Sequence, residues 1–314
     1  MRALFFGTPE FAVPCLRALA DIADVQAVVC QPDKPVGRGL ALAAPPTKVV
    51  AEELGIPVHQ PTKLRTGEFA EWVRAANVDV ALVVAYGRIL PQDVLDGPRL
   101  GCVNVHASLL PKYRGAAPIT WAVVNGEHES GVTLMKMDIG MDTGDALERF
   151  AVPILPDDTA GDLSRRLSDL GALAVRRGLP KYVAGEYTPE AQNHAEATMA
   201  RRLEKNDGRI VWSASAGAVH NHVRGMSPWP GAFTKLSSET GKTVKIHRTA
   251  CAPAMSGGTS EVPGTVERAD KHGVFVRTGN GVVELIDVQL EGKKPMAARD
   301  WAAGRGITAG QILV

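Results

Sequence analysis

Short apolar runs alternate with helix-like patterns through the first 184 residues. Unbroken apolar and β-branched runs predict strands, because a strand buried on both faces carries no polar alternation. Predicted strands cover 3–6, 25–30, 57–59, 80–85, 102–106, 132–137 and 146–153, and predicted helices cover 10–19, 48–54, 68–76, 94–96, 119–124 and 162–183. This alternation predicts an α/β fold with a doubly wound, mostly parallel sheet.

The pattern changes after residue 184. Residues 185–204 are polar and aperiodic, which is typical of a linker. A helical stretch at 214–223 follows, and then come short apolar runs separated by Gly, Asn-Gly and Pro-Gly turns, at 234–236, 243–246, 264–267, 273–277 and 282–288. Such strands predict a small antiparallel barrel or sandwich. The expected organisation is therefore a first domain at 1–184, a linker at 185–204 and a second domain at 205–314.

Composition places the chain among globular proteins. Of its 314 residues, 45% are hydrophobic and 22% charged, which excludes a disordered or fibrous chain. No apolar run approaches the ~18 residues of a membrane helix, and the apolar start ends in a Gly-Thr-Pro turn, so it predicts a strand rather than a signal peptide. Four cysteines without metal-like or redox-like spacing are expected to be reduced thiols of a cytoplasmic protein, namely Cys15, Cys30, Cys102 and Cys251.

Charge is distributed unevenly along the chain. Residues 205–314 hold 14 Lys and Arg against 9 Asp and Glu, whereas residues 1–204 carry an excess of acidic residues. A basic second domain indicates a polyanionic partner, although a solvated surface would account for the same numbers.

Residues with catalytic chemistry gather between 101 and 145. Asn104 and His106 are two positions apart in a predicted strand, so their side chains share a face at the strand end where open α/β sheets bind ligands. A loop at 137–145 then supplies Asp142. These groups would support attack of an amine on an acyl carbon. The imidazole relays the proton, the carboxylate orients the imidazole, and the amide N–H stabilises the oxyanion.

Each of these residues also has a structural interpretation. A single histidine in an α/β protein is often a hydrogen-bonded core or loop residue, and an aspartate in a turn often caps that turn. The face shared with Asn104 leaves the two interpretations of His106 evenly balanced. The first βα turn, Gly7-Thr8-Pro9, has only the first glycine of G-x-G-x-x-G, which disfavours a nicotinamide or flavin enzyme. No cluster has metal-ligand spacing, so no metal is expected.

Two stretches together resemble the signature of the folate-dependent formyltransferases. They are NVHASLLPKYRGAAPI at 104–119 and DIGMDTGD at 138–145. Shorter stretches are similar to those members of the family that act on an aminoacyl-tRNA: FGTPEFA at 6–12, QPDKPVGRG at 31–39 and GKKPM at 292–296. The likeness runs nearly from end to end and is weakest in the linker and at 252–263.

The resemblance implies transfer of a formyl group from 10-formyltetrahydrofolate to the free α-amino group of methionyl initiator tRNA. It implies that Asn104 and His106 assist the tetrahedral intermediate and that Asp142 orients His106. The implied folate contacts are Ser108, Leu109, Leu110 and Pro111, with Gly87, Ile89 and Leu90 and the Asp142 loop around the pterin. It further implies an OB-type second domain, a cis Leu110–Pro111 peptide and a monomeric enzyme.

The loop at 31–46 is longer than the ~2–6 residues usual for a βα connection, which indicates a functional or disordered segment. Lys34 and Arg38 suit phosphates or unstacked bases. The resemblance implies that Arg38 contacts the tRNA acceptor stem and that the loop orders on binding.

Three alternatives stay open. A sugar-nucleotide formyltransferase would share the Asn, His and Asp core but would not need a tRNA-gripping insertion. A glycinamide ribonucleotide formyltransferase would be a single, shorter domain. An RNA-binding protein with an inactive transferase domain would be expected to have lost at least one of Asn104, His106 and Asp142.

Overall fold

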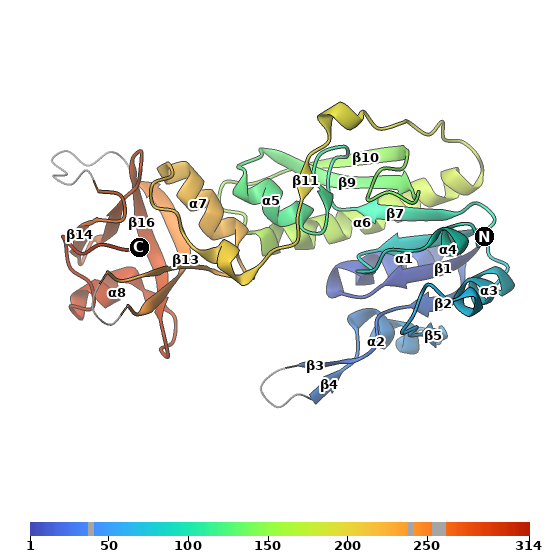
Figure 1. Cartoon of the computed structure of the whole chain (residues 1–314), viewed down its shortest axis with the longest axis horizontal. Helices are drawn as coiled ribbons and strands as arrows, with labels where there is room; N and C mark the ends of the chain where they lie inside the picture. The colour runs from blue at the N-terminus through green and yellow to red at the C-terminus, as the bar shows by residue number, and fades with distance from the viewer. Residues whose placement is uncertain (37–40, 238–240, 253–261) are drawn as a thin grey trace. The chain divides into compact units, whose positions relative to one another are not determined.

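The computed structural model describes residues 1–36, 41–237, 241–252 and 262–314 (Figure 1). Its contacts divide the chain into two compact units. The first unit comprises Met1–Pro118, Glu129–Pro153 and Ser164–Arg201, and the second comprises Ile119–His128, Ile154–Leu163 and Arg202–Val314. Among the described residues, no helix combines the length and apolar character that a membrane crossing needs.

The first unit is built on a seven-stranded sheet in the order β10-β9-β7-β6-β1-β2-β5. Its strands are β1 Arg2–Gly7, β2 Asp24–Val29, β5 Val58–His59, β6 Val80–Val84, β7 Cys102–His106, β9 Glu129–Lys136 and β10 Ala146–Pro153. The pairings from β7 to β5 are parallel, and β9 and β10 add antiparallel strands at one edge. The predicted mostly parallel sheet is confirmed.

Helices lie between the strands. They are α1 Val13–Ile22, α2 Pro46–Glu53, α3 Gly67–Ala75, α4 Gln92–Leu95, α5 Pro118–Val124 and α6 Ala160–Val183. The helix predicted from residue 10 begins as a 3-10 turn, η1 Glu10–Ala12, and only then continues as α1. Proline stands in the first turn of α1 and of α2, where its missing N–H has no partner to lose.

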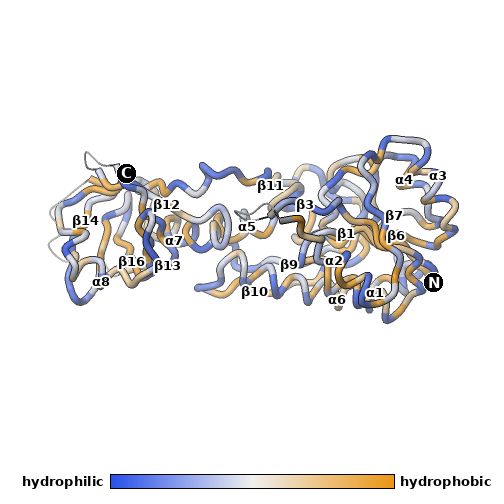
Figure 2. Tube along the Cα trace, turned by 90° about the horizontal axis from the view of Figure 1, so that it is seen from below, coloured by the Kyte–Doolittle hydropathy of each residue, from blue (hydrophilic) through white to orange (hydrophobic). Residues whose placement is uncertain are grey.

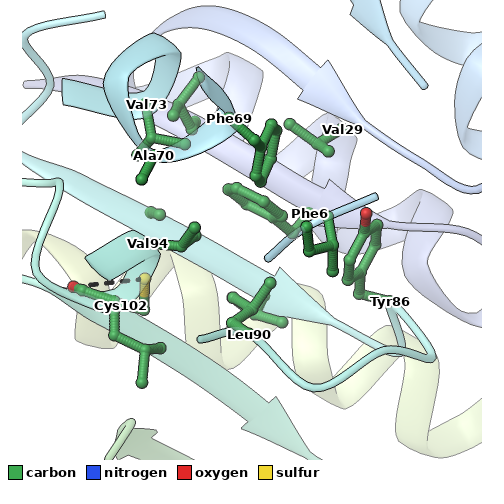
Figure 3. Close-up of a cluster of buried hydrophobic side chains, with 14 of the residues drawn as sticks. Phe6, Val29, Phe69, Ala70, Val73, Tyr86, Leu90, Val94 and Cys102 are labelled. Atoms are coloured by element: carbon green, nitrogen blue, oxygen red, sulfur yellow. Dashed lines mark hydrogen bonds between the residues drawn. The ribbon is translucent and has the colours of Figure 1, made fainter. Parts of the chain in front are cut away.

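The core of the first unit packs helices α3 and α4 on one face of the sheet (Figure 3). Phe6, fully buried, meets Phe69 and Tyr86 edge-on, with ring centroids 6.4 and 5.5 Å apart. On the other face, Gly171 of α6 lies close to α1 and β7, since a Cβ there would be 3.0 Å from Cys15 Sγ. Hydrophobic residues accordingly run along the central strands β1 and β6 (Figure 2).

The four cysteines are free thiols, as predicted. Burial raises the pKa of Cys15 and Cys102 to about 12 and that of Cys30 to about 11. Cys251 is exposed.

Residues 31–46 differ from the predicted loop. β3 Lys34–Val36 pairs antiparallel with β4 Ala41–Ala43, so the loop prediction is wrong for these residues. Arg38, and the predicted ordering of the loop around it, lie outside the described residues.

The second unit holds a six-stranded antiparallel sheet in the order β12-β13-β16-β15-β14, with β17 beside β16. Its strands are β12 Ala232–Lys235, β13 Thr243–Ala252, β14 Val266–Asp270, β15 Gly273–Arg277, β16 Val282–Leu290 and β17 Met296–Ala297. Helices α7 Ala216–Gly225 and α8 Ala298–Ala303 and the 3-10 turn η3 Lys205–Gly208 accompany them. β13 is longer than predicted, and α8 was not predicted.

The last residues of the chain hydrogen-bond to both edges of this sheet. Lys235 of β12 and Val314 exchange two backbone hydrogen bonds of 2.8 Å. Leu313 N donates to Gly264 O, and Val266 N of β14 donates to Gln311 O, both at 2.8 Å. The C-terminal segment therefore satisfies backbone groups that an open sheet leaves unpaired.

Candidate active site

The candidate site forms where strand β7 ends. Asn104 and His106 lie on the same face of β7, as their spacing predicts, and are 9% and 6% exposed. The loop after β9 brings Asp142 to this edge, with its Oδ1 3.6 Å from His106 Nδ1. The structure thus brings the predicted His and Asp together.

His106 has a partner at each ring nitrogen. Nε2 lies 3.0 Å from Tyr113 O, a carbonyl oxygen that can only accept, so Nε2 carries the hydrogen of this bond. In the neutral ring Nδ1 is then the basic nitrogen. A proton taken up by the ring therefore sits on Nδ1, facing the carboxylate of Asp142.

Asp142 is fixed by the backbone around it. Its Oδ2 accepts a hydrogen bond from Gly115 N at 2.8 Å, which leaves Oδ1 towards His106. The residue has φ +53°, a left-handed conformation that a non-glycine residue rarely adopts. Its surroundings therefore hold the loop in a conformation that the backbone does not prefer.

A small pocket of about 130 Å³ lies beside this pair. Two segments line it, Arg88–Leu90 and Asp138–Asp142, together with Met135 and Met137. Ile89, Ile139 and Met141 are more than half exposed, although large apolar side chains are usually buried. Apolar side chains together with the polar groups of Arg88, Asp138 and Asp142 suit a flat ring that carries hydrogen-bonding groups.

A second, open groove of about 440 Å³ shares Arg88 and Ile89 with the pocket. Its other lining residues run from Thr62 to Thr66 and include Lys63 and Arg65. The groove therefore offers positive charge next to the apolar pocket.

The predicted folate contacts at 108–111 do not line this pocket. Hydrogen bonds to β9 and β10 hold Leu110 in place. Leu110 N donates to Thr133 Oγ1 of β9 at 3.0 Å, and Arg149 Nε of β10 donates to Leu110 O at 2.7 Å. Ser108 Oγ donates to Lys112 O. The Leu110–Pro111 peptide is cis, as predicted. A folate contact by Ser108, Leu109, Leu110 or Pro111 stays a prediction.

Gly87 also lies beside the pocket rather than in its lining. It has φ +79°, a backbone conformation that favours glycine. Its role is to turn the chain into the Arg88–Leu90 segment.

The predicted tRNA contact Lys34 has a protein partner, since its Nζ donates to Gln31 Oε1 at 2.7 Å. Next to it, Lys48 Nζ and Gln60 Nε2 both donate to Asp33, which lowers the pKa of that carboxyl. This polar network anchors the base of the β3–β4 hairpin.

Two contributors were missed by sequence reasoning. Arg114 and Gln192 form a hydrogen-bonded pair next to the Asp142 loop, and Gln192 comes from the segment expected to be a linker. Arg114 stands in the 104–119 motif without an assigned role. No sequence signal marks Gln192, because it is one polar residue in an aperiodic stretch.

A strand-end imidazole paired with a carboxylate, beside a ring-sized pocket in an α/β sheet, is an arrangement that can support acyl-group transfer. The family described as "Formyl transferase" matches residues 1–179, and "Formyl transferase, C-terminal domain" matches residues 202–306. The chain belongs to this family of enzymes.

Its relatives narrow the assignment. A protein of Sorangium cellulosum named methionyl-tRNA formyltransferase is 55% identical over 313 residues, covering 100% of this chain and 99% of the relative. One of the same name from Geotalea uraniireducens is 48% identical, covering 100% and 98%.

Among solved structures, the N-formyltransferase from Helicobacter canadensis in complex with folinic acid and dTDP-3-aminofucose matches with a TM-score of 0.67. The identity is 20%, and the match covers 90% of this chain and 98% of that one. This likeness shows the fold.

Proposed function

We propose that this protein transfers the formyl group of 10-formyltetrahydrofolate to the α-amino group of methionyl initiator tRNA, giving N-formylmethionyl-tRNA. The observation that carries the chemistry is the pairing of His106 Nδ1 with Asp142 beside the pocket. The full-length identity to methionyl-tRNA formyltransferases supports the acceptor. The compartment is the cytoplasm, and the protein acts as a monomer.

The residues divide the reaction between them. The amine nitrogen attacks the formyl carbon, and a proton passes from the amine to His106 Nδ1. Asp142 stabilises the resulting imidazolium, while the Asn104 amide donates to the oxyanion of the tetrahedral intermediate. As the bond from the formyl carbon to N10 breaks, the imidazolium returns the proton to N10, and tetrahydrofolate leaves.

The pocket and the groove suit the two ends of the folate. The pocket is small, at about 130 Å³, and therefore suits one ring system rather than a whole folate. The pterin lies there, between Arg88–Leu90 and Asp138–Asp142. The glutamate tail carries carboxylates and extends along the groove towards Lys63 and Arg65.

The second unit serves as the platform for tRNA. Its excess of basic residues supports phosphate contacts, and the exposed cations that would supply them are Lys242, Lys245, Arg248, Lys293 and Lys294. We propose that residues 205–314 form a small antiparallel barrel of OB type, which is supported by the pairing of the C-terminal segment with β12 and β14. In this proposal residues 1–184 carry the catalytic domain and residues 185–204 connect it to the second domain, although the connection packs with the first unit as far as Arg201.

The β3–β4 hairpin is the second tRNA contact. Its base is fixed by the network around Asp33, and Lys34 is exposed there. Lys34 and Arg38 would then reach the acceptor end, where an arginine can bind phosphate and stack on a base.

A formylation assay with three alternative acceptors tests this function. The protein is incubated with 10-formyltetrahydrofolate and, in separate reactions, with methionyl initiator tRNA, free methionine and a dTDP-linked 3-amino sugar. Formylmethionine released from the tRNA is expected in the first reaction only. Formylation of the amino sugar without formylation of the tRNA would overturn the proposal in favour of a sugar-nucleotide formyltransferase.

A further inference from the structure

The segment at 190–200 is packed against the loop that follows β7. Its strand β11 Met199–Ala200 pairs in parallel with β8 Arg114–Gly115, and Arg114 N donates to Thr198 O at 2.8 Å. A Cβ on Gly115 would lie 2.8 Å from Ala200 O, so the contact is close enough to require glycine. A segment with the sequence of a linker is thus part of the scaffold around the site.

Arg114 is a buried cation in this scaffold. It is 6% exposed, and its side-chain partners among the described residues are an amide and an imidazole rather than a carboxylate. Nε and Nη2 donate to Gln192 Oε1 at 3.1 and 2.7 Å, and Nη1 lies 3.1 Å from His194 Nδ1. A buried guanidinium without a carboxylate is costly, so each of these hydrogen bonds is needed to hold it.

Gln192 connects this cation to the catalytic loop. While its carbonyl oxygen accepts from Arg114, its amide nitrogen donates to Asp142 O at 2.9 Å and to Gly144 O at 2.6 Å. The side chain is 5% exposed and uses both its acceptor and its donors. It therefore holds the backbone of the loop at Asp142 and two residues beyond it.

We propose that Gln192, oriented by Arg114, is a positioning residue that holds the Asp142 loop against His106. The loop needs such support because Asp142 has φ +53° and Gly144 lies so close to Lys136 O that no side chain fits. This inference rests on the proposed roles of His106 and Asp142.

The test compares two substitutions at one position. Gln192→Ala removes the acceptor and the donors. Gln192→Glu keeps an acceptor for Arg114, now a charged one, but places oxygen against Asp142 O and Gly144 O. If the donors position the loop, both variants lose about 10- to 100-fold in kcat, because a displacement of about 1 Å at a reacting group has that effect.

The readouts separate positioning from fold support. We expect KM for methionyl-tRNA to stay near that of the parent, the pH profile of kcat to shift, and the thermal midpoint of Gln192→Glu to be retained. Thr188→Ala, at an exposed position of the same polar segment, serves as the matched control and should leave kcat and the pH profile unchanged. If Gln192→Ala does not fold, the isosteric Gln192→Glu decides.

A Gln192→Glu variant with the kcat of the parent would overturn the proposal, because compensation of the Arg114 charge would then be the whole role of Gln192. A loss confined to KM would also overturn it. The parent protein and His106→Ala in the same assay distinguish the two proposals. If the parent is active, His106→Ala is inactive and the Gln192 variants are normal, only the positioning role fails. A parent protein that does not formylate methionyl-tRNA refutes the proposed function, and an active His106→Ala refutes the catalytic role of His106.

Discussion

The two sheets of this chain place their polar residues differently. In the first unit, strands β6 and β7 are buried along their whole length, and catalytic chemistry stands at the end of β7 and in the loops beyond it. In the second unit, β13 alternates buried and exposed positions, so that Lys245 is exposed between buried Val244 and Ile246. The first sheet has its polar functional residues at the ends of its strands, whereas the second sheet has charged residues along the solvent-exposed face of its strands.

This difference has a physical origin. A parallel sheet covered on both faces leaves room for polar groups only at its strand ends, so a few residues there carry the reaction. An antiparallel sheet with one solvated face can hold a row of charges, each adding a small, salt-dependent contribution. Single substitutions should therefore be severe at the edge and mild on the surface.

The largest effect is expected at the strand end. His106→Ala removes the proton acceptor and should lower kcat about 10²- to 10⁴-fold, with little change in tRNA affinity. Asn104→Ala and Asp142→Ala should also reduce kcat far more than affinity. Steady-state formylation and a filter-binding assay measure the two quantities, and near-normal turnover in His106→Ala would contradict the mechanism.

Substitutions in the core of the first sheet should also have a large effect, in this case on the free energy of unfolding. Phe6 is fully buried between Phe69 and Tyr86, so Phe6→Ala should cost about 3–5 kcal/mol of unfolding free energy. Phe275 in the second unit is partly exposed and lies beneath the Arg268 guanidinium at 4.2 Å. Its replacement by Ala should cost less, as measured by urea denaturation, and equal losses would argue against the contrast.

Arg38→Ala tests whether tRNA contacts are confined to the second unit. Slower formylation of methionyl-tRNA with unchanged folate binding is expected, because the hairpin would lose its contact with the acceptor stem. Lys34→Ala should have a smaller effect, since Lys34 Nζ is engaged by Gln31. Folate titration provides the control. An unchanged rate of methionyl-tRNA formylation in Arg38→Ala would contradict a tRNA contact by this residue.

Charge removal on the second unit should act gradually. Replacing Lys242, Lys245, Lys293 and Lys294 together by Gln should raise KM for tRNA and leave kcat at saturation unchanged. If these residues contact phosphates, the slope of log affinity against log salt should become shallower by about 0.7–0.9 per contact. Lys245→Gln alone should change KM only slightly. An unchanged salt slope in the fourfold variant would contradict a phosphate-binding surface.

The smallest effect concerns pH. Burial lowers the pKa of His59 below its usual 6.5, and the ring stacks on Trp72 at 4.3 Å. Because the unfolded state then takes up the proton more readily, the stability from this group is present above pH 6.5 and is lost as pH falls through the lower folded pKa. His59→Phe should therefore show a shallower loss of unfolding free energy below pH 6.5. Parallel curves for parent and variant would refute this.

Sequence patterns predicted the centre of the first sheet because strands β1, β6 and β7 are buried almost throughout and so stand out as unbroken apolar runs. They predicted the second unit less well. β13 extends six residues beyond Ile246 through alternating positions, where exposed Arg248 and Cys251 interrupt the apolar pattern. Helix α8 contains Arg299 and Asp300 among alanines and is too short to show a helical period.

The site was predictable only as far as local motifs reach. Asn104 and His106 share a strand, and Asp142 stands in a distinctive glycine-containing loop. The partner that holds this loop, Gln192, is 50 residues from Asp142 in sequence and joins it through tertiary packing. Sequence periodicity describes how one element faces its surroundings, and it does not specify which distant side chain completes a buried hydrogen-bond network.

Single-turnover formylation most directly tests whether His106 at the end of β7 acts in the chemical step while the lysines of the second unit act in tRNA binding. Enzyme loaded with 10-formyltetrahydrofolate is mixed in increasing excess with methionyl initiator tRNA, and the rate of formylmethionyl-tRNA formation is followed. The account predicts that the fourfold lysine variant reaches the parent rate at saturating enzyme, whereas His106→Ala stays slow at every concentration. A saturating rate that remains low in the lysine variant, or one that recovers in His106→Ala, would contradict it.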